Sequence, residues 1–322
     1  MTALTHLMSK IPIWLYENYA VACSDCTLVR AGMNVILSAR QTSFPHCPIF
    51  IKIFHANRSK HSVEQEGHLN NVLVLHSIAS AKALVSTANT LSCLISIQNQ
   101  KSAVLVFLTA QGKACTLDDD DLTLSASSLF QLHQLTLPSN IQIPLLDINQ
   151  KLHHMSALSN LDFASPELKK HYIHMVETAQ TQYFQSGHSI CHGDPRAQNI
   201  FIHNHRATLI DFEDCCLSTP CLDLAIMIWN IQSNRPQSTY SLDKIHCFIN
   251  HYNQQSTHQF TLQELTPYLL FHEIRSVWFL AQYHLLTPHT ANTILKLSNA
   301  MFSVLKYDIK LNEQSRNHLS HI

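Results

Sequence analysis

Hydrophobic residues are patterned differently in the two parts of the chain. In the first third they form short apolar runs, and the run over residues 49–54 alternates about a single lysine, Lys52. Such runs are typical of β-strands. Further strands are predicted over residues 35–37, 94–97 and 103–108, the last two as a hairpin. A helix is predicted from about Ser62 to His76, so the first third is expected to be rich in strands.

The rest of the chain carries its apolar positions mostly at helical spacing. Helices are predicted over residues 122–135, 166–184, 224–231, 242–252, 262–285 and 290–307. The sequence contains no internal repeat and no low-complexity linker. A strand-rich part is therefore followed by a helical part, with no obvious break between them.

The polar residues with the most specific spacing lie in the middle of the chain. Asp194 and Asn199 are five residues apart, and Asp211 follows a second apolar run. Between them, residues 200–202 and 207–210 are predicted to form two short strands joined by a hairpin turn. A loop is thus followed by two paired strands, and Asp211 comes directly after the second predicted strand.

This arrangement suits phosphoryl transfer from ATP, which requires aligned phosphates, metal ions and one carboxylate directed at the incoming hydroxyl. Asp194 is suited to accept the hydroxyl proton, and Asn199 and Asp211 offer the oxygen ligands that Mg²⁺ prefers. Taken singly, each residue would more often be a surface turn residue. The ordered set indicates a kinase-type site in which Asp194 is catalytic and Asn199 and Asp211 bind metal.

The same segment resembles the aminoglycoside phosphotransferase and choline kinase superfamily, a branch of the protein-kinase-like fold. The family pattern is His-x-Asp with an Asn five positions beyond the Asp, then Ile-Asp-Phe-(Asp/Glu), then Asp-Leu-Ala. Here the three pieces are His192–Asn199, Ile210–Glu213 and Asp223–Ala225. The resemblance implies an α+β, two-lobed fold. Residues 1–110 would form a small nucleotide-binding lobe with an antiparallel sheet, and residues 111–322 a mainly helical catalytic lobe that also binds the acceptor.

The resemblance also implies nucleotide contacts in the first lobe. Lys52 would contact the α- and β-phosphates, and Glu66 of the following helix, or alternatively Glu64, would hold it by an ion pair. Family members commonly carry several glycines in the loop that covers the phosphates. This chain departs from that pattern and offers only Gly32, with Asn34 two residues on, as the expected covering residues.

Several further residues near these motifs have open interpretations. His192 is expected to fix the loop, and Glu213 to position Asp211 or to touch the acceptor. Arg196 would meet a phosphate or an anionic substrate, or simply face solvent. Trp229, Phe271, Arg275, Trp278, Phe279 and Tyr283 are candidates for the acceptor pocket, where aromatic rings would hold an ammonium group. Phe271, Trp278 and Phe279 stand at helical spacing, however, and aromatic residues in that pattern more often belong to a core.

The activity that the resemblance implies is transfer of the ATP γ-phosphate to a hydroxyl of a small molecule, with Mg²⁺ as cofactor. The expected acceptors are amino alcohols, aminoglycosides or homoserine-like compounds. One alternative is a protein Ser/Thr kinase of the bacterial stress-response type. Another is a nucleotide-binding regulator without turnover, which the glycine-poor loop motivates. The acceptor, the choice of ATP or GTP and the oligomeric state are not determined by the sequence.

The composition of the chain limits the classes of partner and the cellular compartment to be expected. The formal net charge of −1 and the absence of a basic run argue against nucleic acid. No apolar run reaches the roughly 20 residues that span a bilayer, so no membrane association is expected. The first residues lack a basic segment followed by an apolar core, and no signal peptide is predicted. The ten cysteines are expected to be reduced thiols of a cytoplasmic protein.

Overall fold

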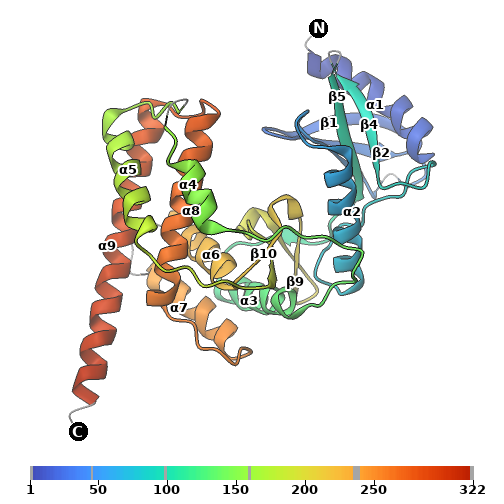
Figure 1. Cartoon of the computed structure of the whole chain (residues 1–322). Coiled ribbons are helices and arrows are strands. Elements are labelled where there is room, and N and C mark those ends of the chain that lie inside the picture. Colours follow the sequence, from blue (N-terminus) through green and yellow to red (C-terminus); the bar gives the residue numbers. More distant parts are fainter. Residues whose placement is uncertain (1–2, 45, 98–99, 159–160, 235–239, 320–322) are drawn as a thin grey trace. The chain divides into compact units, whose positions relative to one another are not determined.

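The chain forms two compact units, which are coloured along the sequence in Figure 1. This computed structural model describes residues 3–44, 46–97, 100–158, 161–234 and 240–319. The units are assembled from segments that are far apart in the sequence. The first contains Met1–Lys113, Thr136–Gln142 and Phe201–Glu213, and the second contains Ala114–Leu135, Ile143–Ile200 and Asp214–Ile322.

The first unit is built on a five-stranded antiparallel sheet with the strand order β1-β2-β3-β5-β4. The strands are β1 (Cys23–Ala31), β2 (Val35–Gln41), β3 (Ile49–Ile53), β4 (Ser92–Ile97) and β5 (Gln100–Leu108). In β3, Lys52 lies opposite Ile36 on one side and Leu105 on the other. Lys52 is therefore in the central strand. The first strand, β1, was not predicted, because most of its residues are exposed and no apolar alternation marks it.

Helix α1 (Ala3–Tyr19) also lies outside the predicted elements. Its residues Ile11 and Leu15 are fully buried in a core cluster that includes the isoleucines of β3. Lys10 and Glu17 are the charged residues of this segment. In the structure both residues are exposed, so they lie on the polar side of an amphipathic helix.

Helix α2 (Lys60–Leu75) packs on the other face of the sheet. Its N-terminus is capped by Ser59, whose hydroxyl accepts a backbone hydrogen bond. Val63 of α2 belongs to a second core cluster together with Phe54, which follows β3. Because side chains alternate across a strand, Lys52 lies on the same face as Phe54. The central lysine therefore faces α2.

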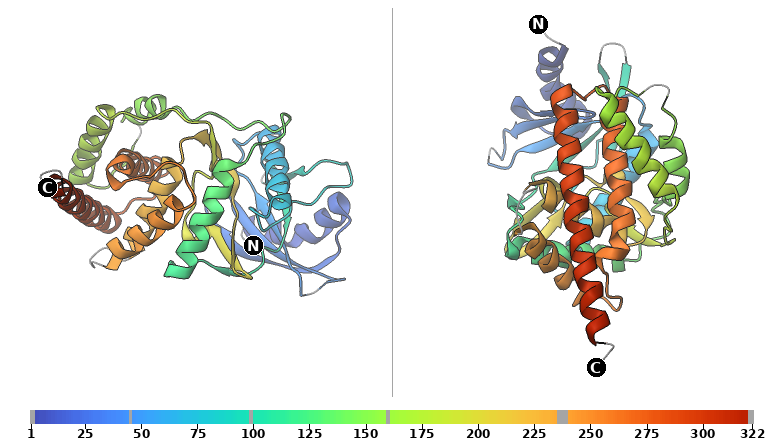
Figure 2. Two further views of the ribbon diagram at one scale, coloured as in Figure 1. Left: turned by 90° about the horizontal axis from the view of Figure 1, so that it is seen from below. Right: turned by 90° about the vertical axis from the view of Figure 1, so that its left-hand side faces the viewer.

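The second unit is mainly helical. Its helices are α3 (Asp119–Gln134), α4 (Ile148–Met155), α5 (Pro166–Gln180), α6 (Cys221–Asn234), α7 (Tyr240–Asn253), α8 (Leu262–Gln282) and α9 (Pro288–Leu319). Helix α6 packs on α8, α3 packs on α7, and Figure 2 shows α8 and α9 side by side. Across the described residues, every helix is either too short or too polar for a bilayer span.

Short strands lead to the predicted functional residues. They are β6 (Lys113–Ala114), β7 (Ser189–Cys191), β8 (Ile200–His203), β9 (Arg206–Leu209) and β10 (Cys216–Ser218). Strand β7 pairs with β10, and β8 pairs with β6 and β9. The β8–β9 hairpin agrees with the prediction, and its turn residues Asn204 and His205 both have positive φ. Positive φ at both positions is typical of a tight type I′ turn.

Helix α1 should contribute substantially to the stability of the first unit. Replacing Leu15 by Ala is expected to lower the free energy of unfolding by about 2–5 kcal/mol, because the buried site keeps a cavity. The matched control is Ile13→Ala on the same helix, where the side chain is 64% exposed and the expected change is within about 0.5 kcal/mol. Denaturant unfolding of the full chain measures both. Equal losses for the two variants would contradict the packing described here.

Candidate functional site

The ammonium group of Lys52 is buried among three carboxylates in the first unit. Its Nζ lies 2.9 Å from Glu66 Oε1, 2.6 Å from Asp211 Oδ1 and 3.1 Å from Glu213 Oε2. Burial opposes the charge on Lys52, but the three carboxylates outweigh it and raise the pKa of Lys52 above its usual value. The lysine is therefore a fixed positive charge at neutral pH.

A second cation, Arg58, completes this cluster. Its guanidinium contacts Glu66 Oε2 at 3.0 Å and Glu213 Oε1 at 3.1 Å. We call Lys52, Arg58, Glu66, Asp211 and Glu213 the charge cluster. In it three carboxyl groups face two cationic side chains, so the acidic groups outnumber the basic ones by one. An arrangement of this kind suits a further cation.

Of the two candidate partners for Lys52, Glu66 is the one that contacts it. Glu64 lies on α2 as well, but its carboxylate accepts hydrogen bonds from the backbone N–H groups of Leu91 and Ser92, both at 2.7 Å. Glu64 thus ties α2 to the start of β4. The two positions are two residues apart on one helix, so they point to different neighbours.

The two residues expected to cover the nucleotide lie in the turn between β1 and β2. Asn34 donates its side-chain N–H to Glu213 of the charge cluster, and its Oδ1 accepts the His55 N–H at 3.3 Å. The turn is closed by a hydrogen bond from the Gly32 N–H to the Asn34 carbonyl at 3.1 Å. An added Cβ at Gly32 would approach no atom closer than 3.9 Å, so the packing of the chain itself does not require glycine there.

Asp211 has an unusual backbone conformation. Its φ is 67°, in the left-handed region that non-glycine residues seldom adopt and that Asp tolerates better than most. Asp211 lies two residues after the end of β9 and immediately before a 3₁₀ turn over Phe212–Asp214. The reversal of the chain at this point accompanies the contact between its carboxylate and Lys52. Its side chain remains 37% exposed.

In the second unit, a buried aspartate fixes the loop that carries Asp194. Asp223, at the start of α6, accepts hydrogen bonds from the backbone N–H of His192 at 2.7 Å and of Gly193 at 2.9 Å. Burial opposes its ionisation, but the hydrogen bond and charge of His133 and the loop contacts outweigh burial and lower the pKa of Asp223. His133 Nε2 lies 3.0 Å from Asp223, and Nδ1 lies 2.7 Å from the Tyr252 hydroxyl.

His133, Cys191 and Asp223 form a compact buried group, but its contacts indicate a structural role. Their potential ligand atoms lie within 4.8 Å of one another. Both ring nitrogens of His133 already have partners, and the Cys191 thiol contacts the Thr219 carbonyl at 3.3 Å. A metal ion would have to displace these bonds. We therefore regard this group as the anchor of the loop.

The loop itself needs glycine at one position. Gly193 has a φ of 80°, and a Cβ there would lie 2.1 Å from the Asp214 carbonyl oxygen. His192 is fully buried, and its Nδ1 accepts the backbone N–H of Asp194 at 3.2 Å. His192 thus has the loop-fixing contact that the sequence analysis expected of it.

Asp194 and Asn199 come together in this loop. The Asp194 Oδ2 accepts hydrogen bonds from Arg196 Nη2 at 2.6 Å and from Asn199 Nδ2 at 3.1 Å. The same Asn199 amide nitrogen also donates to the Asp194 carbonyl at 2.9 Å. These bonds orient the Asn199 amide so that its nitrogen faces Asp194 and its oxygen remains for another partner.

Residues from α6 and α8 contact the loop directly or through Arg275, and two of them, Asn230 and His272, were not predicted from the sequence. Asn230 accepts the backbone N–H of Ala197 at 3.0 Å, and Arg275 Nη2 donates to the Gly193 carbonyl at 2.8 Å. Arg275 also contacts His272, which in turn packs edge-on against Trp229. No spacing rule links these helices to the loop, so only Trp229 and Arg275 were named from sequence, as acceptor-pocket candidates.

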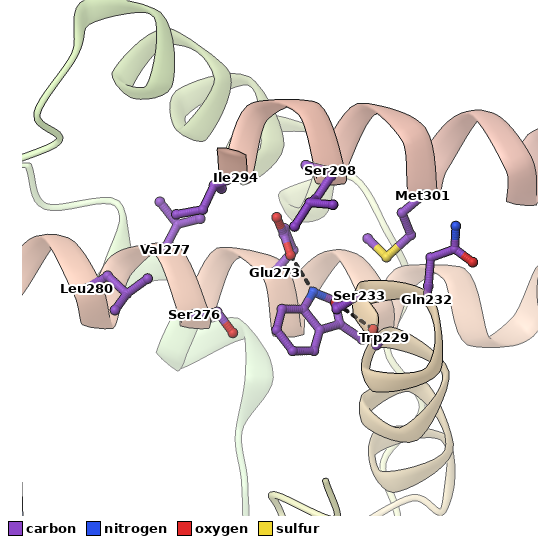
Figure 3. Close-up of a pocket in the computed structure, with 11 residues that line it drawn as sticks. Trp229, Gln232, Ser233, Glu273, Ser276, Val277, Leu280, Ile294, Ser298 and Met301 are labelled. Carbon is purple, nitrogen blue, oxygen red and sulfur yellow. Dashed lines mark hydrogen bonds between the residues drawn. The ribbon is translucent and has the colours of Figure 1, made fainter. Parts of the chain in front are cut away.

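Beside Trp229, helices α6, α8 and α9 enclose a cavity of about 170 Å³, drawn in Figure 3. The Trp229 indole N–H donates to the Glu273 carboxylate. Burial raises the pKa of Glu273, although Trp229 and Ser298 donate hydrogen bonds to it. The other aromatic candidates lie in separate contacts. Phe271 is buried against Phe184, Trp278 packs on His154, and Phe279 packs on Tyr283.

The predicted site residues therefore fall into two groups, one in each unit. The first group contains Lys52, Glu66, Asp211 and Asn34, which all belong to or contact the charge cluster, with Gly32 in the adjoining turn. The second group contains Asp194 and Asn199, which share hydrogen bonds in the loop fixed by Asp223. Arg58 was not predicted, although it contacts the first group. Glu213, for which the sequence left the role open, contacts Lys52 there.

A family model described as the phosphotransferase enzyme family matches residues 49–243, which is more than half of the chain. This range contains the predicted catalytic, metal-binding and nucleotide-binding residues except Gly32 and Asn34. No curated protein matches the sequence.

Solved structures with the same fold cover nearly the whole chain. A microcompartment-associated aminopropanol kinase is 12% identical with a TM-score of 0.73, covering 95% of this chain and 98% of its own. An amicoumacin kinase in complex with AMP-PNP and Ca²⁺ is 13% identical with a TM-score of 0.69, covering 94% and 96%. A choline kinase from Streptococcus pneumoniae is 13% identical with a TM-score of 0.63, covering 92% and 99%. The predicted two-lobed, kinase-like α+β fold is thereby confirmed.

The buried carboxylate of Asp223 should be important for stability. Asp223→Asn is expected to lower the free energy of unfolding by about 3–5 kcal/mol, because the neutral amide cannot replace a buried anion that accepts several hydrogen bonds. The matched control is Asp162→Asn, whose side chain is 57% exposed and for which a change within about 0.5 kcal/mol is expected.

The same variant tests the pKa of Asp223. Since the folded state lowers this pKa, the stabilisation is fully present above the usual Asp pKa of about 3.9 and is lost as the pH falls below it. The stability difference between the wild type and Asp223→Asn should therefore shrink in acid. A difference that stays constant from neutral pH to strong acid would contradict the assignment.

Proposed function

Because the chain belongs to the phosphotransferase enzyme family, we propose that it transfers the γ-phosphate of ATP to a hydroxyl group of a small molecule. The observation that carries this proposal is the buried Lys52, held by Glu66 and in direct contact with Asp211. A lysine fixed in this way is suited to the phosphates of a nucleotide. The proposed setting is the cytoplasm, which supplies ATP and Mg²⁺ and keeps the ten thiols reduced.

In this proposal Lys52 contacts the α- and β-phosphates. Fixing the flexible lysine side chain lowers its conformational entropy. Because the Glu66 ion pair already fixes it, this entropy is lost before the nucleotide binds. Gly32 and Asn34 are the proposed covering residues. Since Asn34 is already bonded to Glu213, it links the covering turn to the charge cluster.

The residues present fit a divalent cation. The acidic groups of the charge cluster outnumber its basic ones by one, Asp211 keeps an exposed carboxylate, and the Asn199 amide presents its oxygen away from Asp194. Carboxylate and amide oxygens are the ligands that Mg²⁺ prefers. We propose Asn199 and Asp211 as the metal ligands. When bound, Mg²⁺ would neutralise charge that develops on the phosphate oxygens.

Asp194 is the proposed catalytic base. Both hydrogen bonds that it receives from side chains end on Oδ2, so among the described residues no side chain donates to Oδ1. The free oxygen suits a carboxylate that must accept a proton from the acceptor hydroxyl. The contacts of Asp223 and His192 hold the loop backbone in place while this happens.

Removing the Asp194 carboxylate should abolish most turnover and leave nucleotide binding intact. Asp194→Ala is expected to lower kcat by about 10²–10⁴-fold, because the carboxylate acts on the transferring group. The measurement is coupled ADP release over a panel of amino alcohols, amino acids, sugars and antibiotics. Calorimetry should show an unchanged nucleotide affinity in Asp194→Ala, which would show that the variant is folded. The control Asp162→Ala should match the wild type, and full activity in Asp194→Ala would refute the role.

The two metal ligands can be tested without turnover. Asn199→Ala and Asp211→Asn should each weaken Mg²⁺-dependent nucleotide binding by about 10–100-fold, the range seen when metal sites are perturbed. Binding of the nucleotide without metal should change much less. Asp120→Asn, an exposed acid at the start of α3, serves as the control. Magnesium-dependent affinity that is unchanged in both variants would exclude these residues as ligands.

A further inference from the structure

Next to the loop that carries Asp194, Arg275 has a positive charge without an acidic partner. The guanidinium is half-buried and donates to the Gly193 carbonyl at 2.8 Å, one residue before Asp194. Its other hydrogen bond goes to His272 Nδ1 at 3.3 Å. Within the described part of the chain, both of its partners are neutral groups. A cation fixed beside a reaction centre by neutral groups is suited to an anion from outside the protein.

His272 adds a buried donor to this cation. A guanidinium only donates, so Nδ1 accepts and the proton of the neutral ring lies on Nε2. Burial, together with the charges of Arg275 and Arg196, lowers the pKa of His272 well below its usual range. The side chain is 3% exposed, and Nε2 has no hydrogen-bond partner. A buried N–H without an acceptor is unfavourable unless a ligand supplies one.

Arg196 completes the group from the loop itself. One of its terminal nitrogens is paired with Asp194 Oδ2 at 2.6 Å, while its Nε is buried and has no partner. The side chain is 33% exposed, so it can be approached from solvent. Arg196 and Arg275 are both close enough to His272 to act on its titration. Arg196 is thus paired with the Asp194 carboxylate, while Arg275 contacts the neighbouring Gly193 carbonyl and His272.

We propose that Arg196, His272 and Arg275 bind a carboxylate of the acceptor, so that the acceptor is a hydroxy acid or a hydroxy amino acid. The inference rests on the proposed function, because it places the acceptor at Asp194. Guanidinium groups match a carboxylate with two parallel hydrogen bonds, whereas an ammonium group would meet like charges here. The cluster thus distinguishes acceptors that share an amine and a hydroxyl and differ only in the carboxylate.

In this arrangement Arg196 contacts both Asp194 Oδ2 and the acceptor carboxylate, and Asp194 remains the proton acceptor. The acceptor hydroxyl oxygen then forms a bond to the γ-phosphorus as the bond between that phosphorus and the bridging oxygen of ADP breaks. The hydroxyl proton goes to Asp194. The products are ADP, a phosphomonoester and one proton.

Matched acceptor pairs test this directly. Serine and ethanolamine, homoserine and 3-aminopropanol, and glycerate and ethylene glycol differ within each pair only in the carboxylate. The carboxylate member of at least one pair should have a kcat/KM about 10–100-fold higher than its partner, as expected for charge-assisted hydrogen bonds. A preference for the carboxyl-free member in every pair that reacts would overturn the proposal.

Variants locate the effect. Arg275→Gln removes the contact with the Gly193 carbonyl for every acceptor, so the readout is the difference between the two members of a pair. KM for the carboxylate member should rise about 10–100-fold more than KM for the carboxyl-free member, and Arg275→Lys should restore only part of this difference because lysine lacks the planar fork. Arg40→Gln, an exposed arginine of β2, is the control. A loss of nucleotide affinity in Arg275→Gln with an unchanged acceptor KM would mean that the arginines bind the transferred phosphate, and would overturn the proposal.

A binding measurement separates this inference from the proposed activity. Calorimetric titration of serine, homoserine and glycerate into Asp194→Asn, which retains the arginines, should give binding that Arg275→Gln removes in the same background. Binding of this kind without ADP release in the wild type would refute the phosphotransferase proposal and support the carboxylate site. ADP release without carboxylate binding would support the phosphotransferase proposal and refute the carboxylate site.

Discussion

The structure depends above all on the burial of one positive charge in the middle of a sheet. A lysine ammonium in a central strand is costly unless carboxylates surround it. Here Glu66 arrives from α2, and Asp211 and Glu213 arrive from the segment after β9. Segments that are distant in the sequence are thus held together by one charge. Arg58 reduces the repulsion among the three carboxylates and leaves an excess that suits a metal ion.

The second unit contains a buried negative charge, which hydrogen bonds and a histidine stabilise. Asp223 is a buried anion, and its compensation comes from backbone N–H groups of the loop and from His133. Its charge therefore determines the path of the loop on which Asp194 lies. Gly193 allows the chain to pass close to Asp214, and its carbonyl accepts a hydrogen bond from Arg275. The residues just before Asp194 are therefore fixed by Asp223 and Arg275, and they position Asp194.

The sequence reveals the residues whose spacing is short and chemically constrained. Asp194, Asn199 and Asp211 lie within one continuous segment, and the apolar flanks of Lys52 mark its strand. Arg58 and His272 carry no such signal, because their partners come from other elements and only packing brings them together. Helix α1 is a different case. Its buried positions recur at helical spacing, with the exposed Lys10 and Glu17 between them, but no helix was predicted there.

The most direct test of the account follows the phosphate itself. The protein is incubated with Mg²⁺, ATP carrying an isotopically labelled γ-phosphate and the panel of hydroxyl acceptors, and the products are analysed by mass spectrometry. The account predicts a labelled phosphomonoester of a small molecule, formed together with an equal amount of ADP and absent with Asp194→Ala. Label found only in inorganic phosphate or on the protein, across the whole panel, would contradict it.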